Sequence, residues 1–230
     1  MQKVLVFIFL MILPVGYSSN MEKESAPAPM VSDCEMLYSE MELEDIVDYK
    51  AFEKAMVGYN KISDKTKDTL TVIDFSKPST DERLFVLDMK EKKLLFSSVV
   101  SHGKNSGDNY ATSFSNRKGS YQSSLGFYLT GETYEGRNGY SLILNGLEKG
   151  FNDRARERSI VIHGAAYSNP GYITTAGRLG RSQGCPALPE AVSDTIIDTI
   201  KDGTLLFIYA NDRSYLTRSR ILSPLRKALR

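Results

Sequence analysis

Two scarce reactive side chains lie close together in the second half of the chain. The sequence has two histidines and two cysteines, and His163 and Cys185 both fall within the stretch 160–188. A thiol attacks a carbonyl carbon as the thiolate, and a nearby imidazole can take up its proton. The spacing therefore indicates a Cys–His nucleophile pair. The alternatives are a buried structural cysteine and a core histidine with satisfied hydrogen bonds.

The residues around this pair predict the elements that position it. The run 159–162, apolar after its first residue and directly before His163, is typical of a buried strand. Cys185 follows Gly184 in a turn-rich segment, which leads to a helix with Pro189 at its first position. Glycine tolerates the backbone angles that aim successive N–H groups at one point, as the oxyanion of a tetrahedral intermediate requires. A helix N-terminus that points at Cys185 would also favour the thiolate.

Apolar periodicity predicts a mainly β (α+β) fold with a helical N-terminal segment and short helices. The charged turn 89–93 joins two expected strands into a hairpin, and the Gly-, Ser- and Asn-rich residues 103–120 predict a long functional loop. The expected strands are 69–75, 83–88, 94–100, 125–129, 141–144, 159–162 and 204–209.

Composition divides the chain into five segments. About 13 largely apolar residues after Lys3 match a secretory signal peptide, because a membrane span needs roughly 20. An uncleaved membrane anchor is the alternative. Ser39–Glu42 fits a capping box that opens a helix. We therefore expect a signal peptide at 1–19, a linker at 20–38, an N-terminal helix at 39–62, a catalytic domain at 63–212 and a basic tail at 213–230.

The charge balance argues against a polyanion-binding protein. The formal net charge is +1, whereas affinity for nucleic acid depends on neutralising many phosphates. Two histidines and two scattered cysteines cannot supply a closed zinc site without carboxylates at motif spacing, and none appears, so we expect no zinc site. A disulfide between Cys34 and Cys185 would mask the nucleophile.

Membrane contact is expected through the signal peptide or, at an anionic envelope surface, through the basic tail.

The central stretch resembles the catalytic motif of the L,D-transpeptidase (YkuD-like) family, in particular its murein branch in secreted bacterial proteins. The family motif has His-Gly, a spacer and then Ser/Thr-His-Gly-Cys. Here His163-Gly164 is followed by Ser182-Gln183-Gly184-Cys185. Segments 114–116, 123–128 and 139–142 support the likeness, which extends over residues 69–210. The resemblance implies an L,D-transpeptidase-like β-sandwich or barrel.

The resemblance also implies the reaction and the substrate. Cys185 would accept an acyl group from a peptidoglycan tetrapeptide stem and release D-alanine, and an acceptor amine on another stem would resolve the thioester. His163 would act as general base and acid, Gly184 and Cys185 would supply oxyanion N–H groups, and Ser182 would orient the motif. A carbapenem adduct on Cys185 and a secreted, periplasmic or cell-envelope location are further implications. Neither a metal nor an organic cofactor is implied.

Two positions depart from the family motif. Gln183 stands where the motif usually has histidine, and glutamine cannot exchange a proton at neutral pH. Ala187 stands where the family often has arginine or asparagine. Recognition of a substrate carboxylate must then come from elsewhere, and Arg178 and Arg181 are the candidates because a guanidinium binds carboxylates bidentately. Solvated surface arginines are the alternative.

Three further residues are candidates for the wall of the substrate cleft. His102 ends the third expected strand, with a polar strand-end residue as the alternative. Asn116 and Tyr128 lie in the supporting segments, with a turn asparagine and a core tyrosine as the alternatives. The long spacer also leaves room for a loop through residues 167–172 over the site.

Two rival functions stay open. With water as the acceptor, the same site becomes an L,D-carboxypeptidase or a peptidase that cleaves cross-links. The missing motif histidine also allows a non-catalytic cell-wall-binding module. Intact Cys185 and His163 argue against the second rival.

Overall fold

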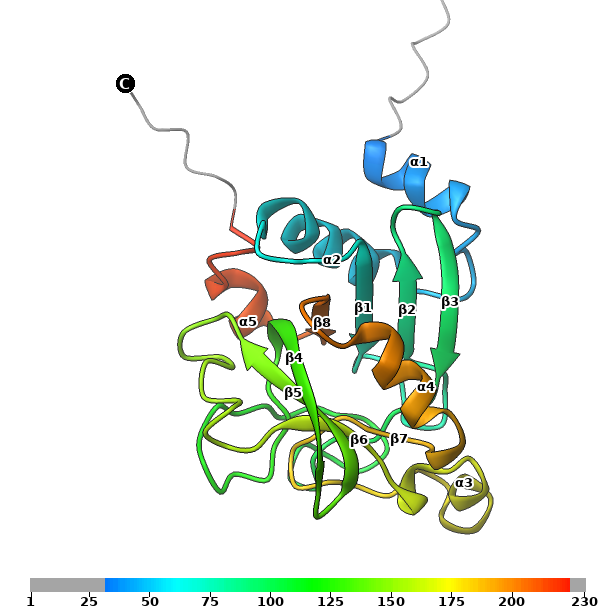
Figure 1. Cartoon of the computed structure of the whole chain (residues 1–230), viewed down its shortest axis with the longest axis vertical. Helices are drawn as coiled ribbons and strands as arrows, with labels where there is room; N and C mark the ends of the chain where they lie inside the picture. The colour runs from blue at the N-terminus through cyan, green and yellow to red at the C-terminus, as the bar shows by residue number, and fades with distance from the viewer. Residues whose placement is uncertain (1–31, 224–230) are drawn as a thin grey trace, which may run out of the picture. The chain divides into compact units, whose positions relative to one another are not determined.

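The computed structural model describes residues 32–223 (Figure 1). The expected signal peptide, most of the expected linker and the end of the basic tail lie outside these residues. Within them, eight strands form one mixed sheet in the order β3-β2-β1-β8-β4-β5-β6-β7. The strands are β1 (Thr69–Asp74), β2 (Leu84–Asp88), β3 (Lys93–Ser98), β4 (Gly126–Gly136), β5 (Gly139–Gly146), β6 (Val161–Gly164), β7 (Ala187–Leu188) and β8 (Leu205–Tyr209).

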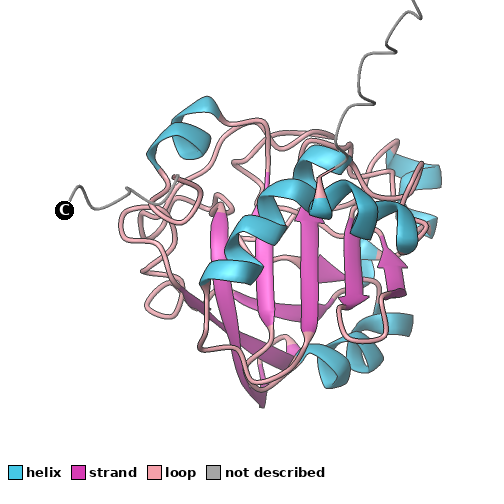
Figure 2. Ribbon diagram, turned by 90° about the horizontal axis from the view of Figure 1, so that it is seen from above, coloured by secondary structure: helices cyan, strands magenta, loops and turns pink. Residues whose placement is uncertain are grey.

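The central strands are almost fully buried because both of their faces are covered. Every residue of β8 is buried, as are the last five residues of β1. Helix α2 (Tyr49–Lys61) packs on β1 and β8, and α4 (Glu190–Ile200) packs on β5 and β6. Figure 2 shows helices crossing in front of the strands. Such two-sided burial explains why β8 is a continuous apolar run.

The sheet is nearly closed, because the chain after β3 reaches the opposite edge. Strand β6 pairs in parallel with the two-residue β7. The segment 182–187, which leads into β7, pairs with residues 101–104 on the side away from β6. Ser101 N–H donates to Ala187 O at 2.8 Å, and Lys104 N–H donates to Ser182 O at 2.8 Å. The mainly β, barrel-like expectation is therefore confirmed, and short backbone pairings replace an open sheet edge.

The N-terminal region differs from the single helix expected at 39–62. Two helices occur, α1 (Asp33–Glu40) and α2, so the end of the expected linker is helical. The capping box is formed by Ser32 and Glu35, not by Ser39–Glu42. Asp48 caps α2 through the Ala51 N–H. The break follows from Glu42 and Asp45, whose φ angles of 53° and 65° are incompatible with a helix.

The start of the basic tail is folded onto the domain. Residues Arg213–Arg218 form α5, and Tyr215 is buried with its hydroxyl donating to Glu148 at 2.7 Å. The Ser219 hydroxyl also donates to the Glu148 carboxylate. The first residues of the expected basic tail therefore belong to the folded domain. The short elements η1 (Ala166–Ser168) and α3 (Gly171–Ala176) complete the fold.

No helix between residues 32 and 223 is long and apolar enough to cross a membrane.

A buried arginine fixes the segment that closes the sheet. Arg83 is fully buried, and its Nε and Nη2 donate to Val100 O at 3.0 and 2.7 Å. Its Nη2 also lies 2.9 Å from Nδ1 of His102. Since a guanidinium cannot accept a hydrogen bond, Nδ1 is the acceptor and His102 is neutral. Burial, reinforced by the charge of Arg83, lowers the pKa of His102 to about 4.

This buried imidazole makes the fold sensitive to acid. Below about pH 6.5 the unfolded chain protonates His102, whereas the folded chain does so near pH 4, so acidification favours unfolding. We expect a loss on the order of 2 kcal/mol in the free energy of unfolding between pH 7 and pH 5. Urea titrations at both pH values measure it. His102→Gln keeps an acceptor for Arg83, so the free energy of unfolding of this variant should fall less between pH 7 and pH 5. An equal fall in both proteins would contradict the assignment of a neutral, buried His102.

Candidate active site

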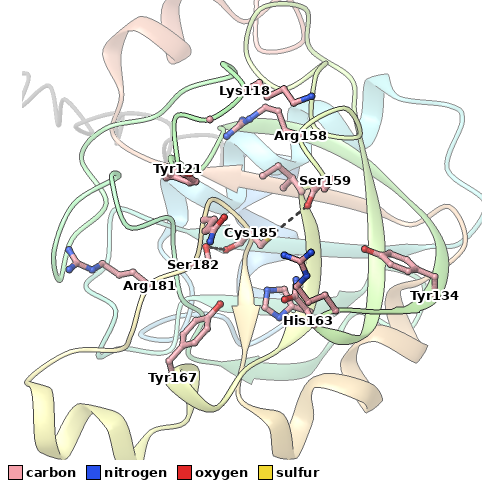
Figure 3. A pocket seen from close by; sticks show the side chains of 15 residues that line it. Lys118, Tyr121, Tyr134, Arg158, Ser159, His163, Tyr167, Arg181, Ser182 and Cys185 are labelled. Atoms are coloured by element: carbon pink, nitrogen blue, oxygen red, sulfur yellow. Dashed lines mark hydrogen bonds between the residues drawn. The ribbon is translucent and has the colours of Figure 1, made fainter.

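A cavity of about 710 Å³ lies over the end of β6 and the turn before β7 (Figure 3). His163 and Cys185 both line it, together with Ser182, Gln183 and Arg181 from the turn. The rest of the wall includes tyrosines and cations from four other parts of the chain: Lys118, Tyr121, Tyr134, Arg137, Arg158 and Tyr167. The sequence-predicted pair is therefore brought to one cavity.

The pairing of two short strands brings the cysteine and the histidine together. His163 is the register partner of Ala187 in the parallel β6–β7 pair. Cys185 lies two residues before Ala187, so the same pairing holds it beside β6. The Ser101–Ala187 bridge holds the other side of this segment. Backbone hydrogen bonds on both sides thus fix the chain that carries Cys185.

The Cys185 thiol lies in a largely buried environment. Its side chain is 8% exposed, and Sγ donates to Ser159 O at 3.6 Å. Burial raises the pKa of the thiol, while the Val161 backbone N–H and the charge of Arg158 act in the opposite direction. A base is therefore needed to generate the thiolate at neutral pH.

His163 is held in the tautomer that can provide that base. Its Nδ1 lies 2.8 Å from Gly164 O. A carbonyl oxygen accepts but never donates, so Nδ1 carries the hydrogen in the neutral ring and Nε2 keeps its lone pair. Burial lowers the pKa of His163, and the bond to Gly164 O partly offsets this effect. The ring is consequently neutral at neutral pH and able to accept a proton.

Ser182 organises the turn that precedes the nucleophile. Its hydroxyl donates to Cys185 O at 2.6 Å and accepts from Gly184 N–H at 3.0 Å. The Gly184 N–H is therefore already engaged, which corrects the expectation that it serves the oxyanion hole. The Cys185 N–H has no acceptor among residues 32–223 and is the free donor at this point.

Gly184 is required by the shape of the turn. Its φ is +129°, and a Cβ built there would lie 2.9 Å from Gln122 O and 3.0 Å from Ile160 Cδ1. Its carbonyl accepts from the buried Ser123 hydroxyl at 3.1 Å. Close approach of the 120–124 backbone and an unusual φ together exclude a side chain at this position.

The two candidate carboxylate-binding arginines share one acidic partner. Arg178 Nε lies 2.7 Å and Arg181 Nη1 lies 3.2 Å from Oδ1 of the exposed Asp108. Arg181 lines the cavity, whereas Arg178 does not. Gln183, which replaces the motif histidine, is exposed and lines the cavity.

The three candidates for the cleft wall lie away from the cavity. His102 and Tyr128 are fully buried, and the Tyr128 hydroxyl donates to Ser124 O at 3.0 Å. Asn116 bridges to Asp153 and to the backbone of Arg154. These placements correct the expectation of substrate contact, because all three side chains have internal partners. They support the loop 103–125 instead.

Several cavity residues were missed by the sequence analysis. Tyr167 lines the cavity from η1, and burial, with a contribution from the charge of Cys185, raises its pKa to about 12. Arg158 precedes β6, and Arg137 lies in the β4–β5 turn. The expected loop over residues 167–172 was the one signal for Tyr167. Arg137 and Arg158 are ordinary charged residues between strands, so the sequence carried no signal for them.

Metal ligands are not clustered in the part of the chain that the structure describes. No group of three or more His, Cys, Asp or Glu side chains there could hold an ion.

Comparison with known families fits this geometry. Residues 43–209 match the family described as the L,D-transpeptidase catalytic domain. The chain belongs to this family. The match includes His163, Cys185 and every strand of the sheet, and it begins before α2. The L,D-transpeptidase domain of this chain therefore includes the second N-terminal helix. No curated protein sequence matched the chain.

Solved structures give distant matches. An L,D-transpeptidase from Mycobacterium smegmatis is 13% identical, with 63% of this chain and 59% of that chain covered and a TM-score of 0.41. The helical cell shape determining protein Pgp2 from Campylobacter jejuni is 13% identical, with 70% and 56% covered and a TM-score of 0.40. The chain thus covers less than two thirds of the length of these structures. The family assignment rests on the sequence match.

A side chain at Gly184 should disrupt the site. We expect Gly184→Ala to cost about 1–3 kcal/mol in the free energy of unfolding and to slow alkylation of Cys185, because the new Cβ displaces the Gln122 backbone. Gly150→Ala is the control, since its φ is +85° but its Cβ meets nothing within 4 Å. Equal thermal stabilities and equal alkylation rates in the two variants would contradict the proposed close approach.

Proposed function

We propose that this chain is an L,D-transpeptidase that cross-links peptidoglycan stem peptides through a thioester on Cys185. The observation that carries the proposal is the joint placement of Cys185 and His163 in one cavity, with His163 in the tautomer that leaves Nε2 able to accept a proton. The family to which the chain belongs supports the same chemistry.

The reaction follows from the positions of the two side chains. The thiol proton moves from Sγ to Nε2 of His163, and the thiolate attacks the carbonyl carbon of the donor peptide bond. The Cys185 N–H stabilises the oxyanion. His163 then protonates the departing amine of D-alanine, which leaves a Cys185 thioester. An acceptor amine attacks the thioester, gives its proton to His163 and releases the cross-linked product and the free thiol.

The charge of the cavity favours an anionic substrate. Four cationic side chains line it, and no acidic side chain does so among the described residues. Arg181 is paired with Asp108, whereas Lys118 and Arg137 form no ion pair within residues 32–223. Stem peptides carry free carboxylates, which such cations attract. Peptidoglycan lies outside the cytoplasmic membrane, so we also propose a secreted or envelope location, consistent with the apolar segment after Lys3.

Incubation with a disaccharide-tetrapeptide tests the proposed reaction. Mass spectrometry should show loss of D-alanine and formation of cross-linked dimers. Cys185→Ala should abolish turnover, because it removes the nucleophile, and His163→Ala should nearly do so. Gln183→Ala should reduce turnover less, since a glutamine amide does not act as an acid or a base at neutral pH.

The other products distinguish the rival functions. Monomeric tripeptide alone would identify water as the acceptor and contradict cross-linking. Binding to cell walls without turnover and without a carbapenem adduct on Cys185 would contradict the enzyme proposal. Inactivity of Gln183→Ala equal to that of Cys185→Ala would contradict the assignment of the base to His163.

The cationic wall should act on substrate binding. We expect Arg137→Gln to raise KM several-fold and to leave kcat close to that of the unaltered protein, because Arg137 lines the cavity from the β4–β5 turn and takes no part in the proposed proton transfers. Steady-state kinetics with the tetrapeptide provide the measurement. Arg213→Gln, at an exposed position of α5, is the charge-matched control. Identical KM values in the two variants would exclude a binding role for Arg137.

A further inference from the structure

Arg158 connects a long loop to the segment that carries the nucleophile. It lies three residues before β6 and is half-buried. Its Nη1 donates to Ser115 O at 2.7 Å and to the Ser124 hydroxyl. Its Nη2 donates to Gln122 O at 2.6 Å and to the Ser120 hydroxyl at 3.2 Å. Four hydrogen bonds thus tie one guanidinium to residues 115–124.

The same guanidinium lies beside the catalytic turn. A Cβ built on Gly184 would lie 3.4 Å from Nη2 of Arg158. The next residue along the chain, Ser159, accepts the Cys185 thiol hydrogen through its carbonyl and has a φ of +55°. Figure 3 shows Arg158, Ser159 and Cys185 along one side of the cavity. Arg158 forms no ion pair with a carboxylate within residues 32–223.

We propose that Arg158 is a positioning residue that holds the 115–124 loop against the catalytic turn and supplies the uncompensated positive charge that faces Cys185. This inference rests on the proposed role of Cys185 as the nucleophile. Arg158 would then favour the ionisation of the Cys185 thiol and would not bind the substrate carboxylate.

The hydrogen bonds of Arg158 argue against a substrate-binding role. A guanidinium has five N–H donors, and the four on its two terminal nitrogens are already used by the loop. Binding a carboxylate bidentately would require it to release part of the loop. Its charge, by contrast, is available without any rearrangement. Burial lowers the pKa of Arg158, yet an arginine remains protonated at neutral pH.

The electrostatic consequence has a defined sign. A positive charge near a thiol favours the thiolate, and the charge of Arg158 lowers the pKa of Cys185 against the effect of burial. Removing this charge must therefore raise the pKa. The other titratable or charged groups that face the cavity lie on the 115–124 loop, the β4–β5 hairpin, β6, η1 and the turn before β7: Lys118, Tyr121, Tyr134, Arg137, His163, Tyr167 and Arg181.

The pH dependence of Cys185 alkylation by iodoacetamide tests the proposal in the full chain. Peptide-level mass spectrometry separates Cys185 from Cys34, so both native cysteines stay in place. Arg158→Gln should raise the midpoint by about one pH unit, because it removes the charge. Arg158→Lys keeps the charge but cannot reach four acceptors, so it should keep the midpoint and lower kcat/KM for the tetrapeptide. An unmoved midpoint in Arg158→Gln would overturn the proposal.

Two controls separate a local effect from a general one. Arg154→Gln removes an exposed arginine four residues earlier and should leave the midpoint and the turnover unchanged. If circular dichroism shows that Arg158→Gln does not fold, Arg158→Lys decides: a midpoint raised in this charge-preserving variant overturns the proposal, and an unmoved midpoint with slower turnover supports it. Alkylation needs no peptidoglycan. The Arg158 inference can therefore fail while muropeptide turnover succeeds, and turnover can fail while the Arg158 inference holds.

Discussion

The site depends on one short piece of backbone being held from both sides. Residues 182–188 lie between β6, which carries His163, and the segment 101–104, which follows β3. Neither contact is long, since β7 has two residues. Together they close the sheet and place Cys185 over the end of β6. In the proposed reaction, a nucleophile on a segment fixed in this way would keep its geometry relative to the base, as proximity catalysis requires.

Buried polar groups surround this segment because a tight turn leaves backbone groups that need partners. The Ser182 hydroxyl donates to Cys185 O and accepts from Gly184 N–H. The Ser123 hydroxyl accepts from Gly103 N–H and donates to Gly184 O. Two arginines, Arg83 and Arg158, then hold the chain segments on either side without carboxylate partners among the described residues. Arg158 and the three other cations of the cavity wall place positive charge beside the turn that carries Cys185, where it would favour the thiolate and the anionic substrate of the proposed reaction.

The sequence allowed the strands, the mainly β class and the Cys185–His163 pair to be predicted, because each leaves a local pattern. The β8 run is apolar throughout, β1 begins with alternating polar and apolar residues, and scarce residue types make the pair conspicuous. The N-terminal helices were misread because Ser39–Glu42 imitates a capping box, while the chain turns there with Glu42 at positive φ. The burial of His102 and the bonds of Arg158 depend on segments distant in sequence, so no local pattern indicates them.

The central claim is that Cys185 carries the acyl group of a stem peptide, activated by His163. The most direct measurement is mass spectrometry of the intact protein, followed by peptide mapping, soon after mixing with disaccharide-tetrapeptide in the absence of an acceptor. The account predicts a mass increase equal to the donor without its terminal D-alanine and without water, located on Cys185 and absent from Cys185→Ala. Release of D-alanine with no adduct on Cys185, or with the same rate in Cys185→Ala, would contradict it.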